Sequence, residues 1–491
     1  MASCDDFPAI RLALEDICPS YDEGLKVSRY RRPAERPSLT WRGDSIVLGT
    51  RVPRWATRIW LSDEKTSQRI GFANLRPVNQ IWSIANDTTI PATAEAFLVP
   101  PERMRKPDYQ IYPLSDIGAL YGEKLAAATC FSRPCRQGGG LCGEACIFMC
   151  CVMLAHRGFR VPATHEISFL AAKRFRRLNG RDGTFRIKGL PFHPRTASLF
   201  STPPIGGSAL YETIPTGEGT AHEPARSLGY TVHQYLRHGL PVIMLVDCGK
   251  LYPEDLEKLK AKYLEEEGKK KTEFEHAVVI VGAHFGKEDQ GLRLHPDGFV
   301  YHDPYRSPYM DVEIERLFRC GRFKHNAGGV YFIAPTPEGV HTGIQCVDYI
   351  TRDVAAGGKL TPPEFGYPER REHLSLWDVT LVPQDQWEKR YFAGIDLSTD
   401  QRQHLNALAK ALPDMMWAAE IYAHAEAMKT RKASAVWFFD ATSHPPAAHA
   451  ISRFFFAAID RGSFQCWLPG TKPPPIFIQG TLPIPDRRPP L

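Results

Sequence analysis

The sequence predicts an α+β fold in which one apolar helix packs on an antiparallel sheet, with β-rich regions flanking this core. The helix is indicated by residues 142–151, an apolar run in which three cysteines recur at every fourth position and therefore share one helix face. The sheet is indicated by residues 275–283 and 299–303, two short runs rich in β-branched and aromatic residues and bounded by Gly or Pro. The predicted core therefore has its helix first and its strands afterwards.

The composition is that of a folded, soluble protein. The chain has 491 residues, of which 43% are apolar and 24% charged, which is ordinary for globular proteins and long enough for about three domains. The net charge of +6 is small for this length, so we do not expect a nucleic-acid partner. No segment has the length and apolarity of a membrane span, so we expect no membrane association either.

The N-terminus and the cysteines bear on the compartment. Residues 1–7 lack the basic and apolar parts of a signal peptide. The 12 cysteines show no regular spacing, which favours reduced thiols inside a cell. We therefore expect a cytoplasmic protein, with delivery by a signal-independent route as the alternative.

Changes of pattern divide the chain into four parts. We expect an N-terminal β-rich accessory domain, a core domain, a C-terminal α+β accessory domain and a Pro-rich tail, at residues 1–124, 125–340, 341–470 and 471–491. Strand-like runs in the two accessory domains lie at residues 45–48, 57–61, 94–99, 377–382, 417–422 and 435–440. A helix is expected at residues 402–412, and the Ala- and Met-rich residues 413–430 also fit a helix. These flanks carry no motif with recognisable chemistry, so we interpret them as substrate-recognition or partner-docking modules.

The start of the apolar helix is the predicted site of a nucleophile. Residues 137–142 read Gln-Gly-Gly-Gly-Leu-Cys, which places Cys142 in the first helical turn. Unsatisfied N–H groups and the positive end of the helix dipole favour thiolate over thiol there. The thiolate is the nucleophile in cysteine chemistry. The side chain of Gln137 is placed to donate a hydrogen bond to a developing oxyanion.

The two predicted strands supply a base and an acid. His276 lies at the start of the first strand, and Asp303 lies at the end of the second, which Pro304 terminates. If the strands are neighbours, the carboxylate orients the imidazole and stabilises its charged form. Cys142, His276 and Asp303 would then form a nucleophile, base and acid arrangement.

The order of these features resembles the papain-like cysteine peptidase superfamily, and most closely its C39-like peptidase branch. The shared features are a Gln before a Cys-Gly pair that opens an apolar helix, a His that opens a Val-rich strand, and a later Asp-Pro pair. The resemblance spans roughly residues 125–335. It implies a papain-like core with Cys142 as nucleophile, Gln137 as oxyanion donor, His276 as base and Asp303 as orienting acid. We expect no cofactor and no metal.

Two insertions depart from the compact family core. Residues 176–224 are rich in Gly, Pro, Ser and Arg, and residues 252–274 form a charged segment with a helical pattern. Long surface insertions cost little stability. Such loops often shape a binding cleft, so the substrate does not follow from the resemblance.

Other interpretations of the thiols stay open. Cys146 is a rival nucleophile, although a buried Cys is often only a small packing residue. A chain without a catalytic Cys is a further alternative. Six cysteines between residues 130 and 151 also suggest a zinc site, but no Cys-x-x-Cys pair occurs among them.

The base and the acid have rivals as well. His284 and His302 lie near the predicted base, and we rank His284 lower because it follows the Gly282 that ends the predicted strand. Asp247 also follows an apolar strand and is the alternative acid. Asp303 and Gln137 also fit ordinary turn positions.

The sequence therefore predicts a cysteine peptidase that cleaves a peptide or isopeptide bond in a protein or peptide substrate. A transferase or a deamidase would use the same residues, because the cleft selects the leaving group and the second nucleophile. An inactive papain-like binding scaffold is the alternative from a different class.

Overall fold

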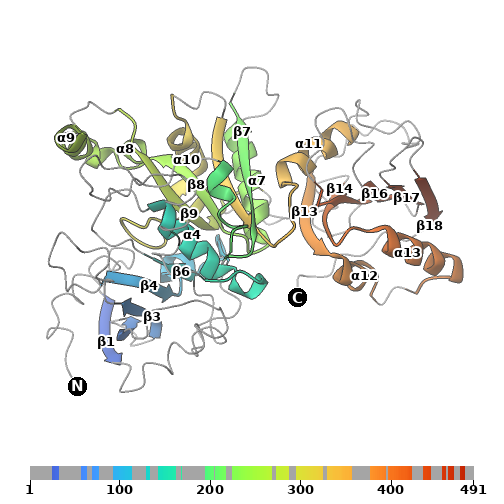
Figure 1. The fold of residues 1–491 in the computed structure, drawn as a ribbon, viewed down its shortest axis with the longest axis horizontal. Coiled ribbons are helices and arrows are strands. Elements are labelled where there is room, and N and C mark those ends of the chain that lie inside the picture. The colour runs from blue at the N-terminus through green and yellow to red at the C-terminus, as the bar shows by residue number, and fades with distance from the viewer. Residues whose placement is uncertain are drawn as a thin grey trace. The chain divides into compact units, whose positions relative to one another are not determined.

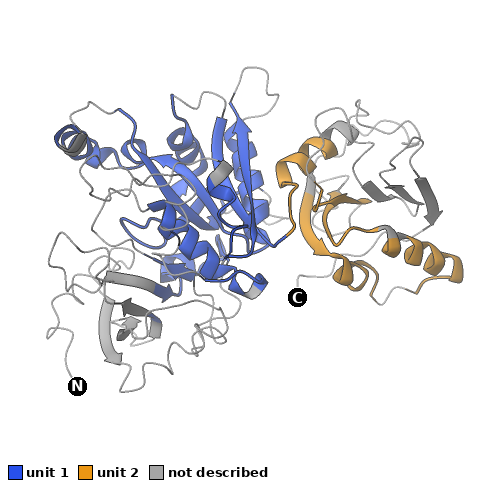
Figure 2. Ribbon diagram, in the orientation of Figure 1, with its two compact units in different colours: residues 1–286, 295–338 blue, residues 287–294, 339–491 orange. Residues whose placement is uncertain are grey.

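The computed structural model contains both helices and strands, in agreement with the predicted α+β class (Figure 1). The chain forms two compact units, residues 1–286 with 295–338, and residues 287–294 with 339–491 (Figure 2). The structure describes residues 25–31, 57–63, 69–76, 92–112, 129–132, 142–161, 167, 194–203, 205–216, 224–267, 272–286, 295–324, 329–355, 376–393, 396–422, 435–443, 456–460, 463–468 and 476–481.

The first unit is built on a seven-stranded sheet. Six of its strands follow the order β11-β10-β9-β8-β12-β7, and the seventh, β5, pairs with β9. Every pairing in it that the structure describes is antiparallel. The strands are β5 (Tyr109–Ile111), β7 (Ser208–Pro215), β8 (Val242–Asp247), β9 (Glu275–His284), β10 (Gly298–His302), β11 (Met310–Glu313) and β12 (Gly329–Thr336). Burial follows the position in the sheet. β8 is buried along its whole length, whereas β7 at the edge alternates between buried and partly exposed residues.

One long buried helix packs against the middle of this sheet. It is α4 (Cys142–Met153), which contacts β9 and β8. Residues 144–153 are all buried, as expected of a helix that is apolar on every side. Helices α7 (Pro224–Arg237) and α10 (Ile314–Gly321) also contact β8. No helix in the described ranges combines the length and the hydropathy that crossing a bilayer requires.

β9 is longer than the sequence predicted. The prediction ended the strand at Gly282, but β9 continues to His284 because β5 and β10 both pair with its last three residues. The glycine permits this pairing, since a Cβ atom there would lie 2.7 Å from the carbonyl oxygen of Gln110.

The same unit contains a second, five-stranded sheet with the order β1-β2-β3-β4-β6. Its strands are β1 (Leu25–Arg31), β2 (Thr57–Asp63), β3 (Arg69–Arg76), β4 (Ala92–Leu98) and β6 (Thr129–Phe131). The predicted strands at residues 57–61 and 94–99 are confirmed by β2 and β4, whereas residues 45–48 lie outside the described residues. The two sheets exchange segments. β5, from the part assigned to the N-terminal domain, joins the central sheet, and β6, from the part assigned to the core, joins the N-terminal sheet.

A buried hydrogen-bonded group links these two sheets. The backbone N–H of Tyr309 donates to Nδ1 of His302 at 3.0 Å, so the ring proton is on Nε2, which lies 2.7 Å from Oγ1 of Thr129. The Thr129 hydroxyl donates to the Tyr309 hydroxyl at 2.6 Å, and that hydroxyl donates to the carbonyl of Leu98. Tyr309 takes a left-handed backbone conformation with φ of 53° to complete this group.

The second unit contains a six-stranded antiparallel sheet with the strand order β13-β14-β15-β16-β17-β18. Its strands are β13 (Leu376–Pro383), β14 (Met415–Tyr422), β15 (Ala435–Asp440), β16 (Phe456–Asp460), β17 (Ser463–Leu468) and β18 (Ile476–Thr481). Its helices are α11 (Ile344–Ala355), α12 (Gln384–Phe392) and α13 (Thr399–Ala411). The predicted strands in this region and the helix at residues 402–412 are confirmed, and the helical alternative for residues 413–430 is wrong where β14 forms.

The first prediction concerns His302. Burial lowers the pKa of its imidazole to about 3, below the ordinary value of 6.5. The unfolded chain therefore binds one more proton than the folded chain between these values, and stability falls as the pH drops through this window. We expect His302→Gln to be less stable than the wild type at pH 7. We also expect its unfolding free energy to depend less on pH between 6.5 and 3, by about 1.4 kcal/mol per pH unit.

Urea unfolding at pH 7, 6, 5 and 4 measures this difference. His404→Gln is the control, because this histidine lies partly exposed on α13. Equal pH slopes for the wild type and His302→Gln would contradict the buried neutral state of this ring.

Candidate active site

Cys142 opens the central helix α4 and is a free, partly exposed thiol. The first-turn N–H groups of a helix have no partner within the helix, and they carry the positive end of its dipole. The sequence prediction of a Cys at a helix start is therefore confirmed. Gln137, the predicted oxyanion donor, lies outside the described residues.

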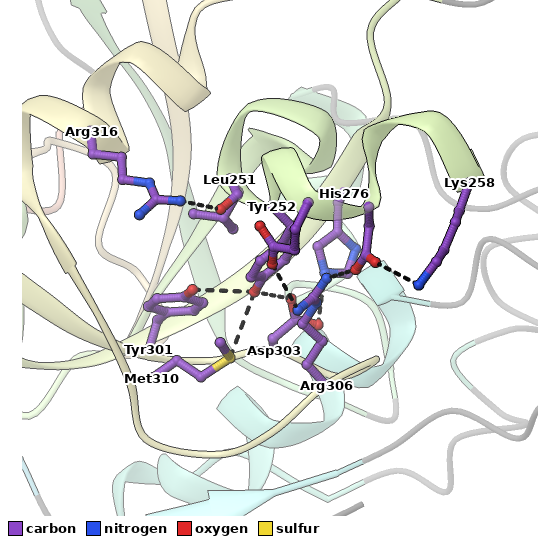
Figure 3. A network of polar contacts seen from close by, with 11 residues as sticks. Leu251, Tyr252, Lys258, His276, Tyr301, Asp303, Arg306, Met310 and Arg316 are labelled. Atoms are coloured by element: carbon purple, nitrogen blue, oxygen red, sulfur yellow. Dashed lines mark hydrogen bonds and ion pairs between the residues drawn. The ribbon is translucent and has the colours of Figure 1, made fainter. Parts of the chain in front are cut away.

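β9 and β10 bring the predicted base and acid together. His276 is the second residue of β9, and Asp303 directly follows β10, which pairs with β9. Nε2 of His276 lies 2.9 Å from Oδ1 of Asp303 (Figure 3). Both side chains are almost completely buried, with exposed fractions of 4% and 1%.

Charges within this group shift both pKa values toward an ion pair. Burial disfavours the charged imidazole, but the charge and hydrogen bond of Asp303 outweigh it, with a further hydrogen bond to the Cys142 side chain, and raise the pKa of His276 well above its usual value. Burial also disfavours the carboxylate, but His276 and the other donors lower the pKa of Asp303. Because Nε2 is occupied by Asp303, Nδ1 is the ring nitrogen left for the sulfur of Cys142. A charged imidazole at this position stabilises a thiolate.

The carboxylate of Asp303 accepts three hydrogen bonds. Oδ1 accepts from Nε2 of His276 and, at 2.8 Å, from the backbone N–H of Tyr305. Oδ2 accepts from the hydroxyl of Tyr252 at 2.6 Å (Figure 3). The residue also forms a turn, since its own N–H donates to the carbonyl of Ser307 at 3.0 Å. Asp303 is therefore both a turn residue and the partner of the histidine.

The rival nucleophile Cys146 is buried, as is Cys150 on the same helix face. Burial raises the pKa of both thiols well above the ordinary value. A thiol in this condition is not a ready nucleophile. In the described part of the chain, no group of three or more His, Cys, Asp or Glu side chains is arranged to hold a metal ion.

The rivals for base and acid have other partners. Oδ1 of Asp247 caps the short helix α8 (Cys248–Leu251) by accepting from the N–H of Gly249 at 3.0 Å, and it also accepts from the N–H of Phe274 at 3.0 Å. His302 belongs to the group that links the two sheets. The ring of His284 lies 5.5 Å from the ring of Tyr109 at the far end of β9.

Sequence reasoning missed three residues at this site. Tyr252 belongs to the charged insertion after β8, and nothing in its local sequence marks it as a partner of Asp303. Tyr305 and Arg306 follow the Asp-Pro pair, and this proximity was the only available signal. The ring of Tyr305 lies 5.3 Å from the ring of His276 and is 38% exposed, so it covers part of the imidazole.

A fourth missed residue, Glu144, lies in the first turn of α4. It is 3% exposed, and neither carboxyl oxygen has a hydrogen-bond partner within the described part of the chain. Burial raises the pKa of this carboxyl to about 7. A buried carboxyl without partners is costly when ionised, so Glu144 destabilises the fold at neutral and alkaline pH.

No family model, no curated protein and no solved structure matches this chain. The chemistry of the site therefore follows from its geometry. A thiol at a helix N-terminus beside a charged imidazole and a buried carboxylate is an arrangement suited to nucleophilic catalysis.

The second prediction concerns Glu144. Its folded-state pKa of about 7 exceeds the ordinary 4.5, so the stability associated with the protonated carboxyl is present below 4.5 and is lost as the pH rises through 7. We expect Glu144→Gln to gain stability relative to the wild type as the pH rises from 5 to 8, by about 3 kcal/mol at most. Urea unfolding at the two pH values measures this gain.

Glu257→Gln is the matched control, because the Glu257 side chain is 83% exposed in α9 (Leu256–Glu267). A stability difference between Glu144→Gln and the wild type that is the same at pH 5 and pH 8 would show that Glu144 does not titrate in this range.

Proposed function

We propose that this chain is a papain-like cysteine peptidase of the C39-like type that cleaves a peptide or isopeptide bond in a protein or peptide substrate. Cys142 is the nucleophile, His276 the base and Asp303 the acid that orients it. The observation that carries the proposal is the convergence of these groups from α4, β9 and the end of β10. These segments are far apart in the sequence. Residues with only a packing role would have no need to bring a thiol, an imidazole and a carboxylate together.

The architecture supports the same proposal. A helix that begins with the nucleophile packs on an antiparallel sheet, and neighbouring strands of that sheet carry the base and the acid. This is the arrangement that the resemblance to the papain-like core implies. The N-terminal sheet and the second unit are then modules for binding the substrate or a partner protein.

The mechanism begins with an ion pair between the thiolate of Cys142 and the imidazolium of His276. The sulfur attacks the carbonyl carbon of the substrate, and the electron pair of the C=O double bond moves onto the oxygen. The oxyanion is stabilised by N–H groups at the start of α4, with Gln137 as the proposed second donor. Asp303 keeps the imidazole oriented throughout this step.

His276 then donates its proton to the leaving nitrogen, and the C–N bond breaks. The acyl group remains on Cys142 as a thioester. His276 next removes a proton from water, which attacks the thioester and releases the carboxylic acid. The thiolate and the imidazolium are thereby restored.

The third prediction concerns the reactivity of Cys142 toward iodoacetamide at pH 6. We expect selective alkylation of Cys142 in the wild type, because the charged imidazole of His276 favours the reactive thiolate. In His276→Ala the rate should fall on the order of a hundredfold, because the thiol loses its charged partner. Mass spectrometry of peptides measures the labelling at each cysteine.

Cys346 is the internal control, because it is also partly exposed, and Cys248 is compared with it as a partly exposed thiol whose pKa burial raises to about 11. His284→Ala is the matched control variant and should react like the wild type. A folded wild type in which Cys142 is no more reactive than these cysteines would overturn the proposal and favour an inactive scaffold. Labelling of Cys146 instead would move the nucleophile to that residue.

The fourth prediction concerns cleavage itself. We expect the wild type to cleave members of a peptide library and Cys142→Ala to cleave none. Cys150→Ala is the matched control, since that thiol is buried two turns further along α4 and should retain cleavage. Acyl transfer to an added amine, or loss of ammonia from glutamine side chains without cleavage, would replace the peptidase with a transferase or a deamidase.

A further inference from the structure

The charged insertion between β8 and β9 contributes a residue to the acid of the site. It begins at Tyr252, directly after α8, and continues through the short 3-10 helix η6 (Pro253–Asp255) and α9. Most of this insertion is a charged helix on the surface, but Tyr252 at its beginning is buried. The insertion is therefore anchored in the interior next to Asp303.

The hydroxyl of Tyr252 has one proton and three neighbours. It lies 2.6 Å from Oδ2 of Asp303, 3.2 Å from the hydroxyl of Tyr301 and 3.6 Å from the sulfur of Met310 (Figure 3). The carboxylate is the nearest and the most strongly charged acceptor, so Tyr252 donates to Asp303, and Tyr301 donates to Tyr252. Burial and the charge of Asp303 raise the pKa of Tyr252 above its usual value, so the phenol remains a donor at any working pH.

Arg306 packs on the face of the Tyr252 ring. Its guanidinium lies over that ring, 3.4 Å from the ring centroid. It also forms ion pairs with Asp255 and, at 3.5 Å, with Glu254, both in η6. The turn that begins at Asp303 and the insertion are therefore joined twice, by the hydrogen bond of Tyr252 and by the side chain of Arg306.

We propose that Tyr252 is a positioning residue, which fixes the carboxylate of Asp303 so that Oδ1 faces His276, and that Arg306 fixes Tyr252. The proposal rests on the proposed function. Oδ1 already accepts from His276 and from the N–H of Tyr305, so Tyr252 is the donor that holds Oδ2. Without it, a buried oxygen of the carboxylate loses its donor, and the carboxylate can rotate away from the imidazole. The insertion is then part of the catalytic apparatus and not only a surface loop.

The test is the pH profile of iodoacetamide alkylation at Cys142 in Tyr252→Phe. The free energy of a hydrogen bond to a charged group corresponds to a factor of about ten in rate. We therefore expect alkylation at pH 6 to be about tenfold slower in the variant, and the acid limb of its pH profile to lie about one unit higher. At pH 9 we expect the variant and the wild type to be alkylated at the same rate. Tyr235→Phe is the matched control, since that tyrosine is equally buried, on α7, with its ring against Phe332. With a cleaved peptide, kcat should fall while KM stays the same.

A second variant tests the proposal if Tyr252→Phe does not fold. Arg306→Lys keeps the charge but removes the flat group over Tyr252, and we expect a shift in the same direction of smaller size. Arg322→Lys is its control, an exposed arginine over the ring of Phe318. A folded Tyr252→Phe, or Arg306→Lys, with an unchanged profile or one moved to lower pH would overturn the positioning role. If the wild type itself lacks a reactive Cys142, the proposed function fails instead, so the two failures are distinguishable.

Discussion

The buried ion pair of His276 and Asp303 is the interaction on which the rest of the first unit depends. Two charged groups removed from water cost free energy unless their attraction and their remaining hydrogen bonds compensate. Here the compensation comes from separate segments: the pairing of β9 with β10, the N–H of Tyr305 and the hydroxyl of Tyr252. Loss of any of these partners would leave a charge poorly satisfied in the interior. The burial of this ion pair therefore requires the central sheet, the turn after β10 and the insertion together.

Two buried histidines in this unit show how surroundings determine charge. His276 faces a carboxylate, which raises its pKa. His302 lies among uncharged hydroxyl and amide groups, so burial lowers its pKa. His302 immediately precedes Asp303 and connects β10 to Thr129 of the N-terminal sheet. Two neighbouring residues at the end of β10 are thus fixed by different interactions. His302 belongs to a neutral hydrogen-bonded group, and Asp303 belongs to an ion pair. The N-terminal sheet supports the site through this connection.

Helix α4 has a partly exposed thiol at its start and ordinary buried packing along the rest of its length. Cys142 is partly exposed, whereas Cys146 and Cys150 on the same face are buried thiols. Glu144 is the exception, because its carboxyl is buried with no hydrogen-bond partner in the described part of the chain, and burial raises its pKa to about 7.

The sequence by itself determined the local elements and their order. An apolar run after a Gly-rich turn predicted α4, and β-branched runs with Gly and Pro boundaries predicted β9 and β10, because such patterns depend on neighbours in the chain. This was enough to select Cys142, His276 and Asp303. Only the tertiary structure decided between strand and helix for residues 415–422, extended β9 past Gly282 and showed that Asp247 is a helix cap. It alone placed Tyr252 and Arg306 at the acid, because contacts between distant segments depend on how the whole sheet packs, and no local pattern encodes them.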